Sequence, residues 1–128
     1  MRKAEADYRL AAKLAADKEA FYDQLCFHCQ QAAEKYLKAL LQELGHPIPR
    51  THMLRDLLNL LIPQYQELHS LQRGVKFLTR FAVETRYPGD SASKRQAKAA
   101  FRWATLVREA ARGRLGIPLA PPSRNKLG

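Results

Sequence analysis

The chain has 128 residues, of which 46% are hydrophobic, and a formal net charge of +10. This length suits one domain with an ordinary hydrophobic core, and no apolar run approaches the roughly 20 residues needed to cross a bilayer, which excludes a membrane-spanning chain. The positive charge is concentrated near the end: residues 1–90 hold 13 Lys and Arg against 11 Asp and Glu, whereas residues 91–128 hold nine against one. This basic last third favours either an acidic partner, such as RNA, a nucleotide phosphate or an acidic protein surface, or a solvated face that only maintains solubility.

The first two predicted elements are helices of unequal length. Residues 3–16 are rich in Ala, Leu, Lys and Glu and predict a first helix, and Asp17 or Lys18 marks the break that follows. Residues 19–44 predict a second helix about 40 Å long, ended by Gly45. Its apolar side chains fill nearly half of the helical wheel, which indicates neighbours on more than one side. We therefore expect an antiparallel hairpin whose second helix is the centre of the domain.

Two shorter helices are expected next. The prolines of HPIPRTH (residues 46–52) interrupt helical structure, and Thr51 is the expected N-cap of a third helix with the sequence MLRDLLNLLI. Helical spacing of apolar residues then resumes from Tyr65 or His69 and continues to Ala82, which predicts a fourth helix. The following TRYPGDSAS (residues 85–93) has the composition of a turn.

The last predicted helix carries most of the basic surplus. Ser91 or Ser93 is expected to cap it, and it should continue to about Leu115. Five small or apolar residues are predicted to face inward: Ala100, Trp103, Ala104, Val107 and Ala111. Five cations are predicted to form a stripe on the outward side: Lys94, Arg95, Lys98, Arg102 and Arg112. We expect one helical domain over residues 1–116 and a Pro-rich disordered tail over residues 117–128.

Cysteine usage indicates neither a disulfide nor a metal site. Cys26 and Cys29 share one helix three positions apart, where a disulfide would be strained, and His28 faces away from Cys26, so we expect buried thiols and no zinc. No cofactor motif is recognisable. Because no secretory signal is apparent either, we expect a reduced, cytoplasmic protein.

Polar residues at helix edges and in loops are the remaining candidates for a binding site. Gln24, His28, Gln31 and Lys35 form a strip along the second helix, where His28 and Lys35 could contact a phosphate or simply border the core. In the loops, Arg50, His52, Arg86 and Tyr87 could bind an anion, although Arg86 could equally be a structural latch to a nearby carboxylate.

Three blocks of this chain, CFHCQQAAEKYLKALL, HPIPRTHMLRDLL and ETRYP, resemble the HEPN family, and the resemblance covers nearly the whole sequence. It implies an all-α, five-helix up-and-down bundle with an HEPN-like four-helix core plus an extra helix. It also implies a homodimer, often encoded beside a minimal nucleotidyltransferase with which it forms a toxin–antitoxin pair. Many HEPN proteins are metal-independent ribonucleases with an Arg four to six residues before a His, and this motif is missing here.

The resemblance therefore favours a binding function over a catalytic one. It assigns a nucleotide- or partner-binding role to six positions that match recurrent polar residues of the family: His28, Gln31, Lys35, His52, Arg86 and Tyr87. The expected ligands are a nucleotide, RNA or a nucleotidyltransferase partner. One alternative is a ribonuclease with an atypical centre, in which His52 acts with Arg50 or Arg86. Another is a structural interaction module, because Phe27 lies outside the apolar arc and could meet a second subunit.

Overall fold

The structure is a computed structural model that describes residues 1–83 and 89–116. Every regular element of these residues is helical, in the order α1 (Arg2–Ala16), α2 (Tyr22–Glu43), α3 (Leu54–Leu61), the 3-10 helix η1 (Gln66–Leu71), α4 (Gln72–Thr79) and α5 (Lys94–Arg114). The predicted all-α bundle is confirmed. Among the described helices, none has the length and apolar character that a bilayer span requires. The expected tail, residues 117–128, lies outside the described part of the chain.

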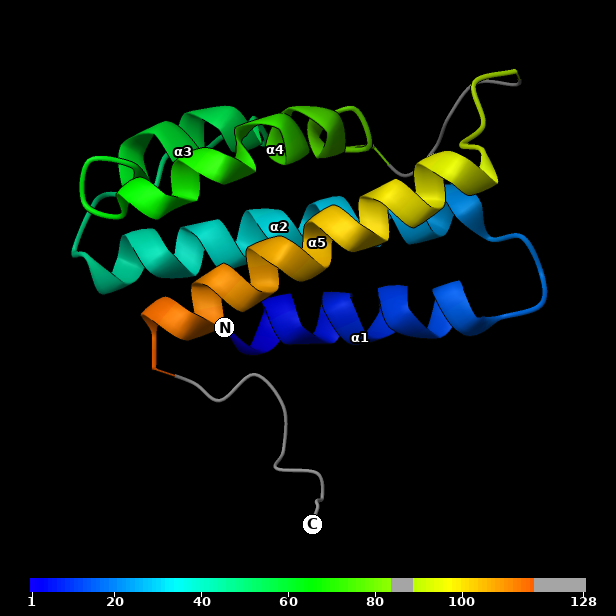
Figure 1. Ribbon diagram of the computed structural model, residues 1–128, viewed down its shortest axis with the longest axis horizontal. Coiled ribbons are helices and arrows are strands. Elements are labelled where there is room, and N and C mark those ends of the chain that lie inside the picture. The colour runs from blue at the N-terminus through cyan, green and yellow to red at the C-terminus, as the bar shows by residue number, and fades with distance from the viewer. Residues whose placement is uncertain (84–88, 117–128) are drawn as a thin grey trace, which may run out of the picture.

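Helix α2 is the centre of the bundle, as the sequence predicts. It contacts each of α1, α3, α4 and α5, which surround it in Figure 1. Its buried apolar residues are Leu25, Cys26, Cys29, Ala32, Ala33, Tyr36, Leu37, Leu40 and Leu41. Removing a leucine side chain from water contributes roughly 2 kcal/mol, so the burial of this wide apolar arc contributes substantially to the bundle's stability.

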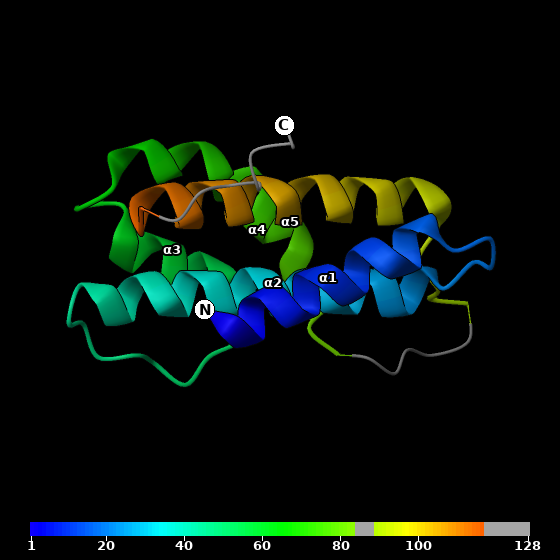
Figure 2. The same ribbon diagram turned by 90° about the horizontal axis from the view of Figure 1, so that it is seen from below.

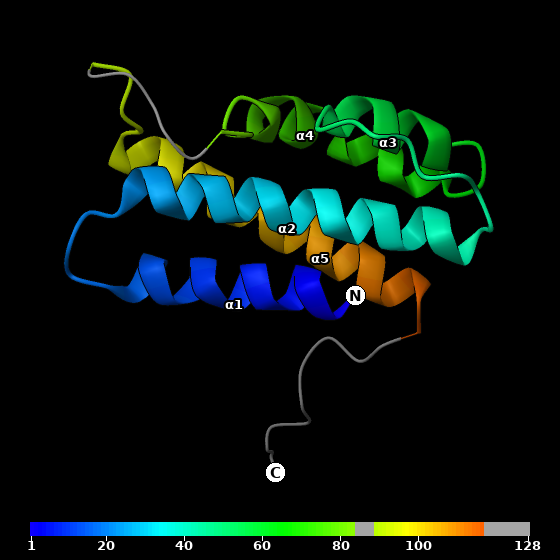
Figure 3. The same cartoon turned by 180° about the vertical axis from the view of Figure 1, so that it is seen from behind.

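The connections determine which helix ends lie together. Helices α1 and α2 form the expected antiparallel hairpin, and after Gly45 (φ +70°) residues 46–53 return along α2 before α3 begins (Figure 2). The Asp23 carboxylate, near the start of α2, accepts a hydrogen bond of 2.7 Å from the backbone N–H of Ala92, just before α5. Helices α2 and α5 therefore start at the same end of the bundle, as Figure 3 shows from behind.

The ends of α3 and α5 differ in how they are capped. The prediction that Thr51 caps α3 is wrong, because the helix begins at Leu54 with Met53 as its N-cap. The Thr51 hydroxyl instead accepts a hydrogen bond from the Met53 N–H (3.0 Å), which forms a tight turn before the helix. At α5 the predicted Ser93 cap is confirmed, since Ser93 and Gln96 form a reciprocal capping box.

The predicted fourth helix is divided and shorter than expected. Its first part is the 3-10 helix η1, and α4 ends at Thr79 and does not continue to Ala82. Gly74 allows α4 to approach α5 closely, because a Cβ atom at this position would lie 2.1 Å from a ring carbon of Trp103. Trp103 is thus partly buried against α4, on the inward side of α5 where the sequence places it.

Candidate functional site

Two residues of the predicted polar strip, His28 and Lys35, form an ionic contact between α2 and α1. His28 Nδ1 lies 3.0 Å from one carboxylate oxygen of Asp7, and Lys35 Nζ donates to the other oxygen. The Asp7 side chain is only 13% exposed. Two of the predicted binding residues therefore share one carboxylate of α1. Because Asp7 already neutralises Lys35, this pair first of all joins the two helices.

A further part of the strip is organised around the buried carboxylate of Glu34. Gln31 donates to the side-chain oxygen of Gln30, which in turn donates to Glu34. Lys38 Nζ and His52 Nδ1 lie 2.8 and 2.9 Å from the two oxygens of Glu34. Burial alone would raise the pKa of Glu34, but the hydrogen bonds from Lys38, His52 and Gln30 outweigh it and hold the pKa below its ordinary value.

His52 is oriented by this carboxylate while remaining open to solvent. Its side chain is 71% exposed, whereas that of Glu34 is 7% exposed. Because an ionised carboxylate only accepts hydrogen bonds, Nδ1 of His52 carries the proton, and in the neutral ring Nε2 is free to accept one. Arg50 is exposed two residues earlier. The other predicted loop residues, Arg86 and Tyr87, lie outside the described residues.

Four of the five predicted stripe cations share one exposed surface on the first half of α5. We call Lys94, Arg95, Lys98 and Arg102 the basic face; they line a shallow open depression of about 680 Å³. Among the described residues, none of these four side chains forms an ion pair with a carboxylate. Their charge is therefore available to an external anion. Arg102 also lies against the ring of its neighbour Trp103, 6.0 Å from the ring centre.

The prediction that Arg112 belongs to this stripe is wrong. Its side chain is 14% exposed and forms an ion pair with Glu5 of α1. Arg108 Nε donates to the same carboxylate (3.0 Å), and Tyr36 of α2 donates to it through its hydroxyl. Burial alone would raise the pKa of Glu5, but these hydrogen bonds and the two arginine charges lower it below the ordinary value. Arg112 therefore stabilises the bundle and does not contribute to the exposed charge.

Sequence reasoning missed this cluster around Glu5 altogether. Glu5 and Arg108 are separated by 103 positions, and helical periodicity relates residues only three or four positions apart. Nothing in the local sequence of α1 distinguishes Glu5 from the other polar residues of this helix or identifies a partner on another helix.

Cys26 and Cys29 lie in the core, where the sequence predicts them. The two thiols are not joined in a disulfide, and both are fully buried. Burial and the neighbouring Cys26 raise the pKa of the Cys29 thiol far above its ordinary value, so it remains protonated and unreactive.

In the described part of the chain, these elements define a helical bundle with two kinds of polar surface: histidine–carboxylate pairs along α2, and on α5 a basic face without a carboxylate partner among the same residues. The comparison with protein families gives this architecture its class, because residues 1–114 match the HEPN domain. The chain belongs to the HEPN domain family, whose members are generally related to nucleotides or RNA. Neither the curated proteins nor the solved structures include a match to it.

Proposed function

We propose that this HEPN domain binds RNA through the basic face of α5, and that nucleotide phosphates are smaller ligands of the same surface. The observation that carries the proposal is four exposed cations without a carboxylate partner in the described residues. The first turn of α5 contains no acidic residue, so the positive end of the helix dipole adds to the charges of Lys94 and Arg95. Such a surface attracts phosphates, and neutralising them releases counterions.

Salt dependence tests the proposal directly. Fluorescence anisotropy of a labelled short RNA, and competition by ATP, should be measured with the full chain over a range of salt concentrations. We expect the logarithm of the association constant to fall linearly with the logarithm of salt, with a slope of about 0.7 for each phosphate contacted in a single strand. Absence of binding to both ligands at low salt would contradict the proposal.

The partner proposals use other surfaces. We propose a homodimer that pairs with a minimal nucleotidyltransferase as one half of a toxin–antitoxin system in the cytoplasm. The support is family membership together with Phe27, which is only partly buried on the outer side of α2 and contacts the ring of His28 edge-on. Sedimentation of Phe27→Glu tests the dimer. The variant should dissociate; an unchanged dimer, or a wild-type chain that is already monomeric, would contradict this role of Phe27.

A specific observation favours a second candidate function, metal-independent cleavage of RNA. His52 is held by Glu34 through Nδ1 while its side chain is largely exposed, which suits a general base that takes the proton of a ribose 2′-hydroxyl through Nε2. That oxygen would attack the adjacent phosphorus, and the 5′-oxygen would leave with a proton. Arg50, in the same segment, could stabilise the charge on the phosphate oxygens.

A matched pair of histidine variants tests this candidate. RNA should be incubated in EDTA with wild type, His52→Ala and His69→Ala, since His69 is exposed in η1 and has no carboxylate partner among the described contacts. Cleavage that is lost only in His52→Ala would support catalysis. Equal background cleavage by all three proteins would reject it and leave the binding proposal unaffected.

A further inference from the structure

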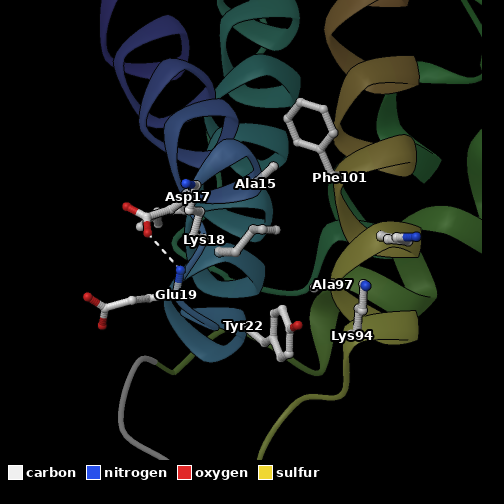
Figure 4. A pocket seen from close by; sticks show the side chains of 11 residues that line it. Ala15, Asp17, Lys18, Glu19, Tyr22, Lys94, Ala97 and Phe101 are labelled. Carbon is white, nitrogen blue, oxygen red and sulfur yellow. Dashed lines mark hydrogen bonds between the residues drawn. The ribbon is translucent and has the colours of Figure 1, made fainter.

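A pocket of about 360 Å³ lies next to the basic face, where the α1–α2 turn meets the start of α5. This volume is at the lower end of the range for small-molecule sites. Its apolar lining comes from three helices and consists of Leu14, Ala15, Tyr22, Leu25, Ala97 and Phe101. Figure 4 shows the rings of Tyr22 and Phe101 in the gap between the α1–α2 side and α5. The pocket therefore offers aromatic surface to a flat apolar group.

The charges around this pocket are mainly positive. Three lysines line it, Lys18, Lys94 and Lys98, together with two acidic residues of the α1–α2 turn. Asp17 accepts a hydrogen bond of 2.8 Å from the backbone N–H of Glu19, and both carboxylates point away from Phe101 and Lys94 in Figure 4. An occupant would thus meet aromatic rings inside the pocket and lysines at its edge.

The pocket and the basic face are continuous, because Lys94 and Lys98 line both the pocket and the open depression beside it. A chain of phosphates that follows the basic face would pass the mouth of the pocket. The ligand that combines phosphates with flat apolar groups at short intervals is a nucleic acid strand. Its bases can enter an aromatic pocket only when they are neither paired nor stacked in a duplex.

We infer that the pocket receives one unpaired base of single-stranded RNA while the basic face holds the adjoining phosphates. This inference rests on the proposed function and specifies its ligand as a single strand. The pocket supplies base stacking, which distinguishes single strands from duplexes, whereas the basic face supplies charge, which does not. The two contributions can therefore be removed separately.

The experiment fills the pocket without changing any charge. Ala15 is exposed and lines the pocket, whereas Ala16 is exposed at the same helix end and does not line it. Anisotropy should compare a labelled single-stranded RNA with a duplex of equal phosphate number, on wild type, Ala15→Trp and Ala16→Trp. We expect Ala15→Trp to weaken single-strand binding about tenfold, a typical loss for one stacked base. Duplex binding and its salt slope should stay unchanged, and Ala16→Trp should match wild type.

Each result separates this inference from the proposed function. Equal affinities of Ala15→Trp and wild type for the single strand would overturn the inference while RNA binding itself remained. A competition experiment gives a further test, in which the labelled single strand is displaced either by a free mononucleotide or by an unlabelled copy of the same strand. Equal displacement by the two competitors would also overturn the inference, because the pocket would then be a nucleotide site. If wild type bound neither the single strand nor the duplex, the proposed function itself would be wrong.

A 2-aminopurine base in the single strand gives a second measurement. Its fluorescence should fall on binding to wild type, since stacking on the rings of Tyr22 and Phe101 quenches it.

Discussion

The two halves of α5 contain similar cations in different environments. In the second half, Arg108 and Arg112 share the carboxylate of Glu5, and Arg114 pairs with Glu67 of η1. In the first half, the four cations of the basic face form no ion pair with a carboxylate among the described residues. On the same helix, the cations of the second half therefore connect α5 to other helices, whereas those of the first half are exposed.

The position of each half relative to the helix dipole increases this difference. Arg112 and Arg114 lie in the last turn, where a positive charge is favourable, whereas Lys94 and Arg95 lie in the first turn, where it is unfavourable. The interaction with the dipole is therefore favourable for the cations of the last turn and unfavourable for those of the first turn. A helix start without any acidic residue is difficult to explain by stability, and binding of an anion gives it a physical reason.

Removing the central carboxylate of the second half should have the largest effect. Glu5→Gln keeps the side-chain shape but removes the negative charge that lies against the partly buried guanidinium groups of Arg108 and Arg112. We expect the free energy of unfolding to fall by about 2–3 kcal/mol, less than for a fully buried pair because Glu5 is 15% exposed. Urea unfolding measures this change. Glu109→Gln, on the exposed side of α5, is the matched control and should be nearly neutral.

Acid should weaken the contacts of Glu5 with the second half of α5, and those of Glu34 on α2, without a mutation. The folded-state pKa values of Glu5 and Glu34 lie below the ordinary 4.5. Their contribution to stability is therefore complete above this ordinary pKa and is lost as the pH falls through the lower folded-state values. The melting temperature of wild type should decrease in this range, and Glu5→Gln should show a smaller decrease. Equal acid sensitivity of the two proteins would contradict the assigned role of Glu5.

The comparison also explains which features the sequence could predict. Helix α2 was predictable because its apolar arc and the Gly45 that follows it are local signals. The start of α5 was predictable from Ser93 for the same reason. The division of the fourth helix into η1 and α4 was not predictable, because the helical spacing of apolar residues continues through both elements.

The candidate site was predictable only in part, and Arg112 shows why. Lys94 and Arg112 are separated by about five helical turns, so a helical wheel places them in line. The wheel carries no information about neighbours along the helix, and Glu5 of α1 meets only the second half. Likewise, the spacing along α2 placed His28 and Lys35 on one polar edge of the helix. It could not reveal that the carboxylate of Asp7 on α1 contacts both side chains.

Neutralising the first half should weaken RNA binding and leave the fold intact. Lys94→Gln combined with Lys98→Gln removes two cations at the junction of the basic face and the pocket. We expect binding to weaken about tenfold at low salt, with a salt slope smaller by about 1.4, because two phosphate contacts are lost. Arg73→Gln combined with Lys76→Gln, both exposed in α4, is the control with equal net charge. Equal losses in both double variants would mean that only total charge matters.

The smallest effect should be a gain in stability. Arg95→Glu places a negative charge in the first turn of α5, where the helix dipole favours it, and we expect the free energy of unfolding to rise by about 0.3–1 kcal/mol. Arg102→Glu makes the same charge change in the middle of α5 and should show little or no gain. Thermal unfolding measures both variants, and both should bind RNA more weakly than wild type. Opposite signs for stability and binding in Arg95→Glu would mean that the start of α5 is arranged for an anion at the expense of the fold, whereas a loss of stability would show that Arg95 has a structural role.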